Sequence, residues 1–240
     1  MVYKHPSKSN IVILTGAGIS AESGLSTFRD ENGLWCQHRI EDVATPEGFR
    51  RDPQLVHRFY NQRRAQLKDV KPNAAHLALA EWERRWKEEE RGNFLLVTQN
   101  VDDLHQRAGS RNIIALHGEL LKARCSHTEK VMAWSEDLAT DLPCACCGNP
   151  GAMRPHIVWF GEMPLEMETI YAALSECDMF VSIGTSGTVY PAAGFVMEAR
   201  RNQKARTVEI NLESSGSPYF HEVFEGKASQ LVPNLANSIS

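Results

Sequence analysis

Short, unbroken runs of apolar residues recur along the chain and alternate with longer amphipathic stretches. The runs cover residues 11–15, 94–97, 113–116, 179–183 and 207–210, and a weaker one lies near Gln230-Leu231-Val232. Runs of this kind are typical of strands buried on both faces. Helical stretches lie between most of them, the clearest over 73–90, where Asn73 is a good N-cap and Gly92 a good stop. The alternation predicts an α/β fold with a mostly parallel sheet and helices on both faces.

Two stretches do not follow this alternation. Residues 31–70 carry no strand signal and are expected to form helices and loops inserted into the main fold. Residues 121–155 are polar and rich in cysteine, which indicates a small metal-binding module. Both should lie beside the sheet, and a cleft between unequal domains is a usual place for a ligand.

Composition excludes several classes of function. The chain has 240 residues, of which 42% are hydrophobic and 23% charged, with a formal charge of −4 that gives no electrostatic case for nucleic-acid binding. No apolar run approaches the roughly 20 residues that a membrane span needs. Residues 1–10 lack the apolar segment of a signal peptide, so we expect a cytoplasmic protein that does not bind membranes.

Polar or glycine-rich turns follow four of the predicted strands. The first, around Gly16 and Gly18, presents free backbone N–H groups suited to phosphate, but its glycine spacing fits neither the dinucleotide fingerprint nor the Walker loop. The others are 98–105, 184–187 and 211–213. Because the carboxyl ends of parallel strands meet at one edge of a sheet, these groups should converge on one ligand. Residues 98–105 could also simply cap the following helix.

His117 follows the strand at 113–116 and is a candidate for proton transfer near neutral pH, although a lone histidine is often structural. Glu213 suits the hydroxyl groups of a ribose.

Taken in order, these motifs resemble those of the sirtuins, NAD-dependent protein lysine deacylases. The stretches are 16–30 (GAGISAESGLSTFRD), 98–102 (TQNVD), 116–119 (LHGE), the cysteine module, 158–162 (VWFGE), 184–186 (GTS) and 211–213 (NLE). The match covers about residues 10 to 233 and is most similar to the short bacterial enzymes of the desuccinylase-like class. The resemblance implies a single Rossmann-like catalytic domain over 1–240. Its NAD-binding core would comprise about 1–30, 71–120 and 156–240, and its small domain 31–70 and 121–155.

The resemblance implies a site for NAD and a reaction that consumes it. His117 would be the general base, with Asn100 and Asp102 as further catalytic residues. The acyl group would leave lysine as O-acyl-ADP-ribose while nicotinamide departs. NAD would be held by Gly16, Ala17, Gly18, Ser20, Glu22, Phe28, Arg29, Trp35, Gln99, Asn100, Val101, Asp102, Gly184, Thr185, Ser186, Asn211, Leu212, Glu213 and Ala228.

The resemblance also assigns segments to the substrate. Val158, Phe160, Gly161 and Glu162, with the loop after Gly187, would hold the acyl-lysine peptide as an added strand, which allows broad specificity.

Tyr60 and Arg63 are spaced to share one helix face, so a phenol and a guanidinium could bind one carboxylate. Without a family resemblance, a surface arginine beside a half-buried tyrosine is the favoured interpretation of this pair. In desuccinylase-like sirtuins such a pair forms an enlarged acyl pocket together with an alanine, matched here by Ala44. We therefore expect removal of succinyl and related acidic groups, and also of acetyl.

The cysteine module departs from the family pattern, in which two Cys-x-x-Cys pairs hold a structural zinc. Cys125 is followed three positions later by Thr128, so the first pair is incomplete. We expect Cys125, Cys144 and Cys147 as ligands, with Cys146 as a possible substitute and His127 as a candidate fourth ligand.

Two other functions remain open from the sequence: mono-ADP-ribosyl transfer from NAD to protein, and catalytically idle binding of NAD or ADP-ribose. The presence of His117 and Asn100 argues against the idle protein, and the Tyr60–Arg63 pair favours deacylation over transfer. We expect a monomer.

Overall fold

The computed structural model describes residues 8–26, 34–35, 38–201 and 203–239. In chain order its elements are β1 (Ile11–Thr15), α1 (Ala17–Ala21), β2 (Leu34–Trp35), β3 (His38–Arg39), α2 (Ile40–Val43), α3 (Pro46–Arg51), α4 (Pro53–Gln66), α5 (Ala74–Glu88), β4 (Phe94–Thr98), α6 (Leu104–Ala108), β5 (Ile113–Ala115), β6 (Gly118–Cys125), β7 (Val131–Ala133), β8 (Met153–Ile157), α7 (Met167–Glu176), β9 (Met179–Ile183), η1 (Ala192–Gly194), α8 (Phe195–Arg201), β10 (Arg206–Asn211), β11 (Glu222–Glu225) and α9 (Ala228–Ser238). None of the helices in these described stretches is long and apolar enough to cross a membrane.

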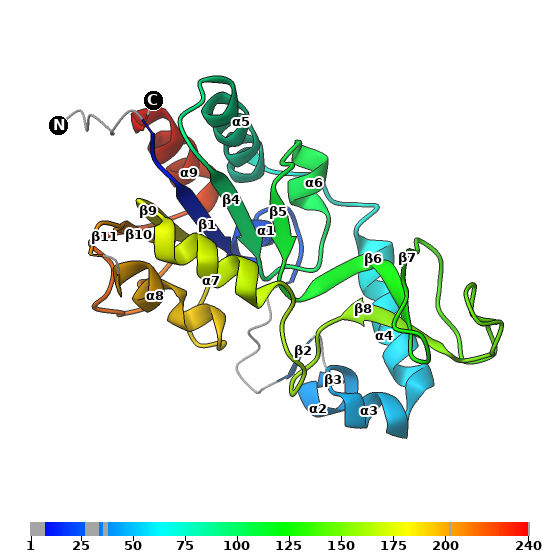
Figure 1. Cartoon of the computed structure of the whole chain (residues 1–240). Helices are drawn as coiled ribbons and strands as arrows, with labels where there is room; N and C mark the ends of the chain where they lie inside the picture. The colour runs from blue at the N-terminus through cyan, green and yellow to red at the C-terminus, as the bar shows by residue number, and fades with distance from the viewer. Residues whose placement is uncertain (1–7, 27–33, 36–37, 202, 240) are drawn as a thin grey trace.

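A parallel sheet of six strands forms the larger part of the molecule, in the order β11-β10-β9-β1-β4-β5 (Figure 1). β1 lies in the interior of this sheet, with Ile13 opposite Leu96 of β4 on one side and Val181 of β9 on the other. All five pairings are parallel, so every strand ends at the same edge. The α/β fold with a parallel sheet is confirmed.

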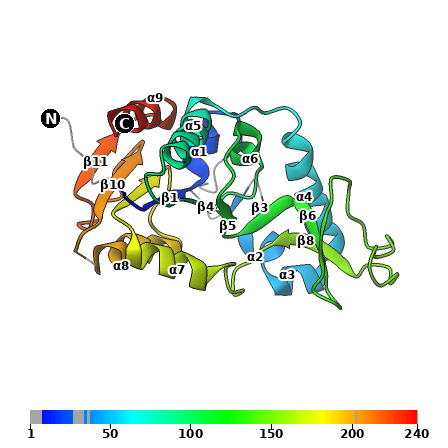
Figure 2. The same cartoon turned by 45° about the horizontal axis from the view of Figure 1, so that its top comes forward.

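Helices cover both faces of this sheet, as Figure 2 shows. Successive side chains of a strand point to opposite faces, and β1 is apolar throughout. Ile11 and Ile13 pack with residues of α5 and α9 in one core, and Val12 and Leu14 pack with residues of α7 and α8 in the other.

A smaller lobe combines α2–α4 with an antiparallel sheet of order β7-β6-β8 (Figure 1). Its core joins Phe59 and Tyr60 of α4 to Leu120 of β6, Ile157 of β8 and Trp159. Residues 40–67 and 118–159, far apart in the sequence, are therefore packed together beside the carboxyl edge of the large sheet.

The local predictions failed at several strands, including β2 and β3, which lie within 31–70 where only helices and loops were expected. The weak strand expected near Gln230-Leu231-Val232 is wrong, because these residues lie in α9, whose buried positions Ala228, Val232, Leu235 and Ala236 recur at helical spacing. The sixth parallel strand is β11, whose exposed Val223 and Phe224 left no buried apolar run to recognise. The strands β6 and β8 were also missed, since polar residues interrupt both.

Candidate functional site

Two glycine-containing turns touch at the carboxyl edge of the large sheet. The Gly18 N–H donates to the carbonyl of Gly184 (2.8 Å). A Cβ at Gly16 would lie 2.7 Å from that carbonyl oxygen, and one at Gly184, whose φ is +61°, would lie 2.5 Å from the Ile19 nitrogen. The glycines therefore permit backbone contact between the turn that starts α1 and the turn after β9. The N–H groups of Gly16, Gly18 and Gly184 all donate to backbone carbonyls, so these glycines hold the two turns against each other.

Buried polar side chains also join the loop after β4 to the turn after β1 and to α1. The Asn100 amide donates to the Gly16 carbonyl and to Ser20 Oγ, both at 3.1 Å. Ser20 Oγ in turn donates to Asp102 Oδ2 (2.9 Å), and the other Asp102 oxygen accepts from the Leu104 N–H. Burial raises the pKa of Asp102. Asn100, Asp102 and Ser20 thus form one hydrogen-bonded group that fixes the loop after β4 against α1.

The same edge brings together further residues expected at the nucleotide. Gln99 Nε2 donates to Thr185 Oγ1, and Asn211 Nδ2 donates to the Thr185 carbonyl, both at 2.9 Å. Glu22 accepts hydrogen bonds from the backbone and hydroxyl of Ser229, beside Ala228 at the start of α9. Four strand-end turns and the start of α9 therefore converge.

His117 lies next to Gln99. It follows β5, where the large sheet meets the smaller lobe. Its Nδ1 is 3.1 Å from the Gln99 carbonyl oxygen. Because a carbonyl oxygen only accepts, Nδ1 carries the proton and Nε2 is left as the basic nitrogen. Burial lowers the pKa of His117. The neutral ring is therefore a base at pH 7.

The segment 158–162 connects His117 to the small lobe. The Val158 N–H donates to the carbonyl of His117, and the Phe160 N–H donates to the carbonyl of Ala44, both at 2.9 Å. Ala44 is buried at the end of α2, while Phe160 and Gly161 are exposed. The residues expected to bind substrate thus lie between the candidate base and α2.

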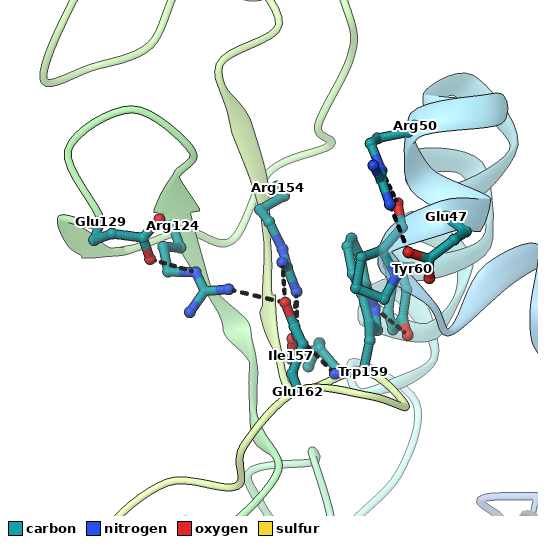
Figure 3. Close-up of polar contacts among 10 residues, drawn as sticks. Glu47, Arg50, Tyr60, Arg124, Glu129, Arg154, Ile157, Trp159 and Glu162 are labelled. Atoms are coloured by element: carbon teal, nitrogen blue, oxygen red, sulfur yellow. Dashed lines mark hydrogen bonds and ion pairs between the residues drawn. The ribbon is translucent and has the colours of Figure 1, made fainter.

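A network of four charged or aromatic side chains holds this segment against α4 (Figure 3). Arg154 donates to both carboxylate oxygens of Glu162, at 2.6 and 2.9 Å, and its guanidinium lies 3.4 Å from the centre of the Trp159 ring. Trp159 Nε1 donates to the hydroxyl of Tyr60 (3.0 Å). Sequence reasoning missed Arg154 and Trp159; the only signal was an arginine among apolar residues just before 158–162.

Tyr60 and Arg63 occupy the inner part of α4. Tyr60 is completely buried, and burial raises the pKa of its hydroxyl. The Arg63 guanidinium lies 5.1 Å from the centre of the Phe59 ring. Phe28 and Arg29 lie outside the described residues, as does the side chain of Trp35.

Two buried histidines were also missed. They lie behind the nucleotide edge, the name used here for the carboxyl edge of the large sheet where Gly16, Asn100, Gly184 and Asn211 meet. His105 Nε2 is 2.9 Å from the Thr15 hydroxyl, and its ring lies 4.8 Å from that of His76. His76 Nε2 approaches Ser20 Oγ at 3.4 Å. Isolated histidines on helices gave no sequence signal that they would meet here.

The cysteine module brings four thiols together. Within the described residues, the group of possible metal ligands consists of Cys125, Cys144, Cys146 and Cys147, whose sulfur atoms lie within 4.8 Å of one another. Tetrahedral zinc with Zn–S bonds of about 2.3 Å requires sulfur separations of about 3.8 Å. The Cys125–Cys147 and Cys144–Cys146 separations are 3.7 and 3.4 Å. The four thiols therefore fit a structural zinc ion.

The position of Thr128 explains the incomplete sequence pattern. Its hydroxyl lies 3.2 Å from Cys146 Sγ. A hydrogen bond from Thr128 lowers the pKa of the Cys125 thiol to about 6, which favours the thiolate that a metal needs. His127 Nδ1 is 3.9 Å from Cys147 Sγ and 3.1 Å from the Asn149 amide. Cys146 thus lies where the missing partner of Cys125 would be.

The fold and this arrangement define the class of protein. Residues 16–191 match the Sir2 family model, and the chain belongs to the Sir2 family. It is 60% identical over 233 residues to an NAD-dependent protein deacylase of Vibrio parahaemolyticus, covering 96% of this chain and 95% of that protein. It is also 60% identical over 229 residues to an NAD-dependent protein deacylase of Bdellovibrio bacteriovorus, covering 94% of each.

Solved structures show the same fold with ligands. A Sir2 homologue in complex with NAD superposes with a TM-score of 0.85 at 35% identity, covering 97% of this chain and 90% of that one. A Sir2 protein bound to an acetylated peptide superposes with a TM-score of 0.79 at 27% identity, covering 96% and 94%.

Proposed function

We propose that this protein is an NAD-dependent protein deacylase that removes acyl groups, including acidic ones such as succinyl, from lysine side chains. The observation that carries this proposal is the chain of contacts from Gln99 through His117 and Val158 to Phe160 and Ala44. It joins the nucleotide edge, a basic histidine and the segment expected to bind peptide. The names of its relatives support the same activity.

The residues at this edge fit NAD because the turns after β1, β4, β9 and β10 converge there, with the polar side chains of Gln99 and Asn100 among them. When bound, NAD would supply a ribose carbon for attack by the acyl oxygen, nicotinamide as the leaving group, and a ribose hydroxyl that captures the acyl carbon. His117 Nε2 removes the proton from that hydroxyl group. Asn100 and Asp102, held by Ser20, orient the sugar end, and the small lobe covers the reacting groups, which keeps water from competing.

The preference for acidic acyl groups is supported by Tyr60, which packs with Ala44 and Trp159 in one core. Arg63 follows three positions later in α4, with its guanidinium over the Phe59 ring. An arginine binds a carboxylate through a charge-assisted, planar fork. Acetyl should also be accepted, because a roomier pocket does not exclude a smaller group.

The first test is to incubate the protein with NAD and a succinyl-lysine peptide and follow the masses of all species. We expect nicotinamide, O-succinyl-ADP-ribose and free lysine peptide. ADP-ribosylated protein as the product would indicate the transferase instead, and no nicotinamide release would indicate an idle binding protein.

Arg63→Met tests the acyl preference. Loss of a hydrogen bond to a charged group is worth about 1.5–3 kcal/mol, so kcat/KM for the succinyl peptide should fall about 10- to 100-fold while that for the acetyl peptide changes little. Arg58→Met, on the exposed side of the same helix, is the matched control. Equal losses on both peptides would contradict the assignment.

We also propose that the protein works as a cytoplasmic monomer on acyl-lysine proteins bound as extended peptides, and that it contacts neither nucleic acid nor membrane. The support is the net charge of −4 and the lack of disulfides among the five described cysteines, which suits a reducing compartment. Size-exclusion chromatography with light scattering tests the monomer.

A further inference from the structure

A cavity of about 170 Å³ lies on the α7–α8 side of the sheet, behind the turn after β9. Leu14, Phe180 and Ser182 line it from the strands, and Ala193 and Val196 line it from η1 and α8. Leu14, Phe180 and Val196 belong to the core on the α7–α8 side, opposite the core that contains α9 and Ile19 of α1. Of the described residues assigned to NAD above, Thr185 also lines this cavity.

The buried carboxylate of Glu209, in the middle of β10, lines this cavity. The residue is 2% exposed. Its Oε1 accepts the Ser215 N–H at 3.0 Å, while Oε2 is buried without a hydrogen-bond partner among the described residues. Of the described lining residues, Glu209 alone carries a charged group. A buried carboxylate oxygen without a partner is costly, and a cation that donates a hydrogen bond removes that cost.

Aromatic side chains form much of the remaining wall. Phe180 and Phe220 stack with an interplanar angle of 17°, and Tyr190 and Tyr219 also line the cavity. Aromatic faces attract cations as well as apolar groups. A cavity of about 150 Å³ holds a benzene ring, so this one has room for a single ring with a short polar arm.

We propose that this cavity is a binding site for a small ligand that carries a primary ammonium group on a hydrophobic body of about one aromatic ring. The ammonium group donates to Glu209 Oε2, and the ring lies among the aromatic side chains. This inference goes beyond the proposed deacylase activity. Binding of the ligand does not depend on that activity, and only its effect on the peptide KM rests on the proposed function.

The site is placed to influence the substrate segment. Gly187 and Tyr190, which line the cavity, belong to the loop expected to hold one side of the peptide. Thr185, another lining residue, accepts the hydrogen bond from Gln99. An occupant therefore contacts the back of the peptide loop, and it should change KM for the peptide more than kcat.

The test measures binding of 2-phenylethylamine, which is protonated at pH 7, by isothermal titration calorimetry in the absence of NAD and peptide. 2-Phenylethanol is the neutral comparison. Because a hydrogen bond to a charged group is strong, the amine should bind about tenfold more tightly than the alcohol. Glu209→Gln should remove that preference.

Glu225→Gln is the matched control. Glu225 Oε1 accepts the neighbouring Ser214 N–H at 3.0 Å, as Glu209 does for Ser215, but Glu225 is exposed and does not line the cavity. It should leave the preference for the amine intact. Ala193→Leu, which fills the cavity and keeps Glu209, should weaken binding of both ligands.

Three results would overturn the proposal: equal affinity for amine and alcohol, unchanged amine affinity in folded Glu209→Gln, or displacement of the amine by ADP-ribose, which would locate it in the nucleotide site. If Glu209→Gln does not fold, two results decide the question: the preference of the unmodified protein for the amine, and weaker binding of both ligands by Ala193→Leu. A failure of binding leaves the deacylase assay unaffected, so the two proposals fail separately.

Discussion

Trp159 shows how one side chain links the two halves of the candidate site. Its indole N–H bonds Tyr60 of α4, its backbone N–H bonds Glu162, and its ring faces Arg154. Arg154 is itself buried and paired with Glu162, so the salt bridge and the cation–π contact share one guanidinium (Figure 3). Movement of the peptide segment would therefore disturb the expected acyl pocket as well.

His117 carries the prediction that belongs to single residues. His117→Asn should lower kcat by about 10²- to 10⁴-fold, the usual contribution of a general base. Because burial lowers the pKa of His117, its basic form persists below the ordinary value of 6.5. In the unmodified protein the acid limb of kcat/KM should therefore lie below pH 6.5, measured by nicotinamide release.

The exposed His221 provides the control for this substitution. His221→Asn should retain near-normal activity because His221 lies away from the nucleotide edge, beside Arg200 and Thr207. Full activity of His117→Asn at pH 7 would rule out the assigned role.

Among the secondary-structure elements, the contact between the turns that follow β1 and β9 determines the geometry of the nucleotide edge. Gly184→Ala should unfold the protein at lower temperature and weaken NAD binding, because the new Cβ meets Ile19 backbone in addition to the cost of positive φ. Gly216→Ala has a similar φ of +70° but nothing within 4 Å of the new Cβ.

Calorimetric melting and NAD titration of both variants separate the two effects. Gly216→Ala should lower the free energy of unfolding by about 1–2 kcal/mol, which is the cost of the left-handed conformation alone. Gly184→Ala should lower it clearly more. Equal costs in the two variants would show that the turn contact is not tight.

The cysteine module has too small a core to be stable without help. Its buried cluster contains only small or medium side chains, such as Ala123, Ala152 and Met153, besides the thiols. A bound zinc ion contributes folding free energy directly in such modules.

We expect one zinc per chain by metal analysis, and Cys146→Ser should reduce this content and lower the melting temperature. Cys177→Ser, in the core between α7 and the sheet, should leave the zinc content unchanged. Full zinc in Cys146→Ser would assign the fourth position to another group.

The sequence predicted those elements whose stability is local. α5 begins after its Asn73 cap and ends near the expected position, because capping and periodicity are properties of the helix alone. Within α5, however, the carboxylate of Glu83 is buried and accepts the backbone N–H groups of Arg111 and Asn112. Such contacts depend on a loop 28 positions or more further along the chain. They cannot be read from local spacing.

For the molecule as a whole, three buried histidines make stability sensitive to acid. Burial lowers the pKa of His57 and His76 to about 4 and that of His105 to about 3. Their pKa in the unfolded chain is about 6.5. Between these values the unfolded state binds more protons, so the free energy of unfolding falls as pH drops below about 6.5.

As pH falls from 7 to 5, each of these histidines should lower the free energy of unfolding by about 1–2 kcal/mol, measured as the shift of the urea midpoint. His57→Leu removes one titrating ring and should therefore reduce this loss of unfolding free energy by about 1–2 kcal/mol. The substitution costs little at pH 7, because neither ring nitrogen of His57 has a hydrogen-bond partner among the described residues. An unchanged pH dependence in this variant would contradict the argument.

The interior position of β1 has a consequence for how the chain folds as it is synthesised. β1 leaves the ribosome first, but Thr15 meets Thr98 of β4 only 83 residues later, and Asn10 meets Asp178 only after 168. During this interval the β9 side of β1 is an unpaired, apolar strand edge, the kind of surface that promotes aggregation. The nascent chain should therefore depend on chaperones until about residue 183 has emerged, and β10, β11 and α9 should join last.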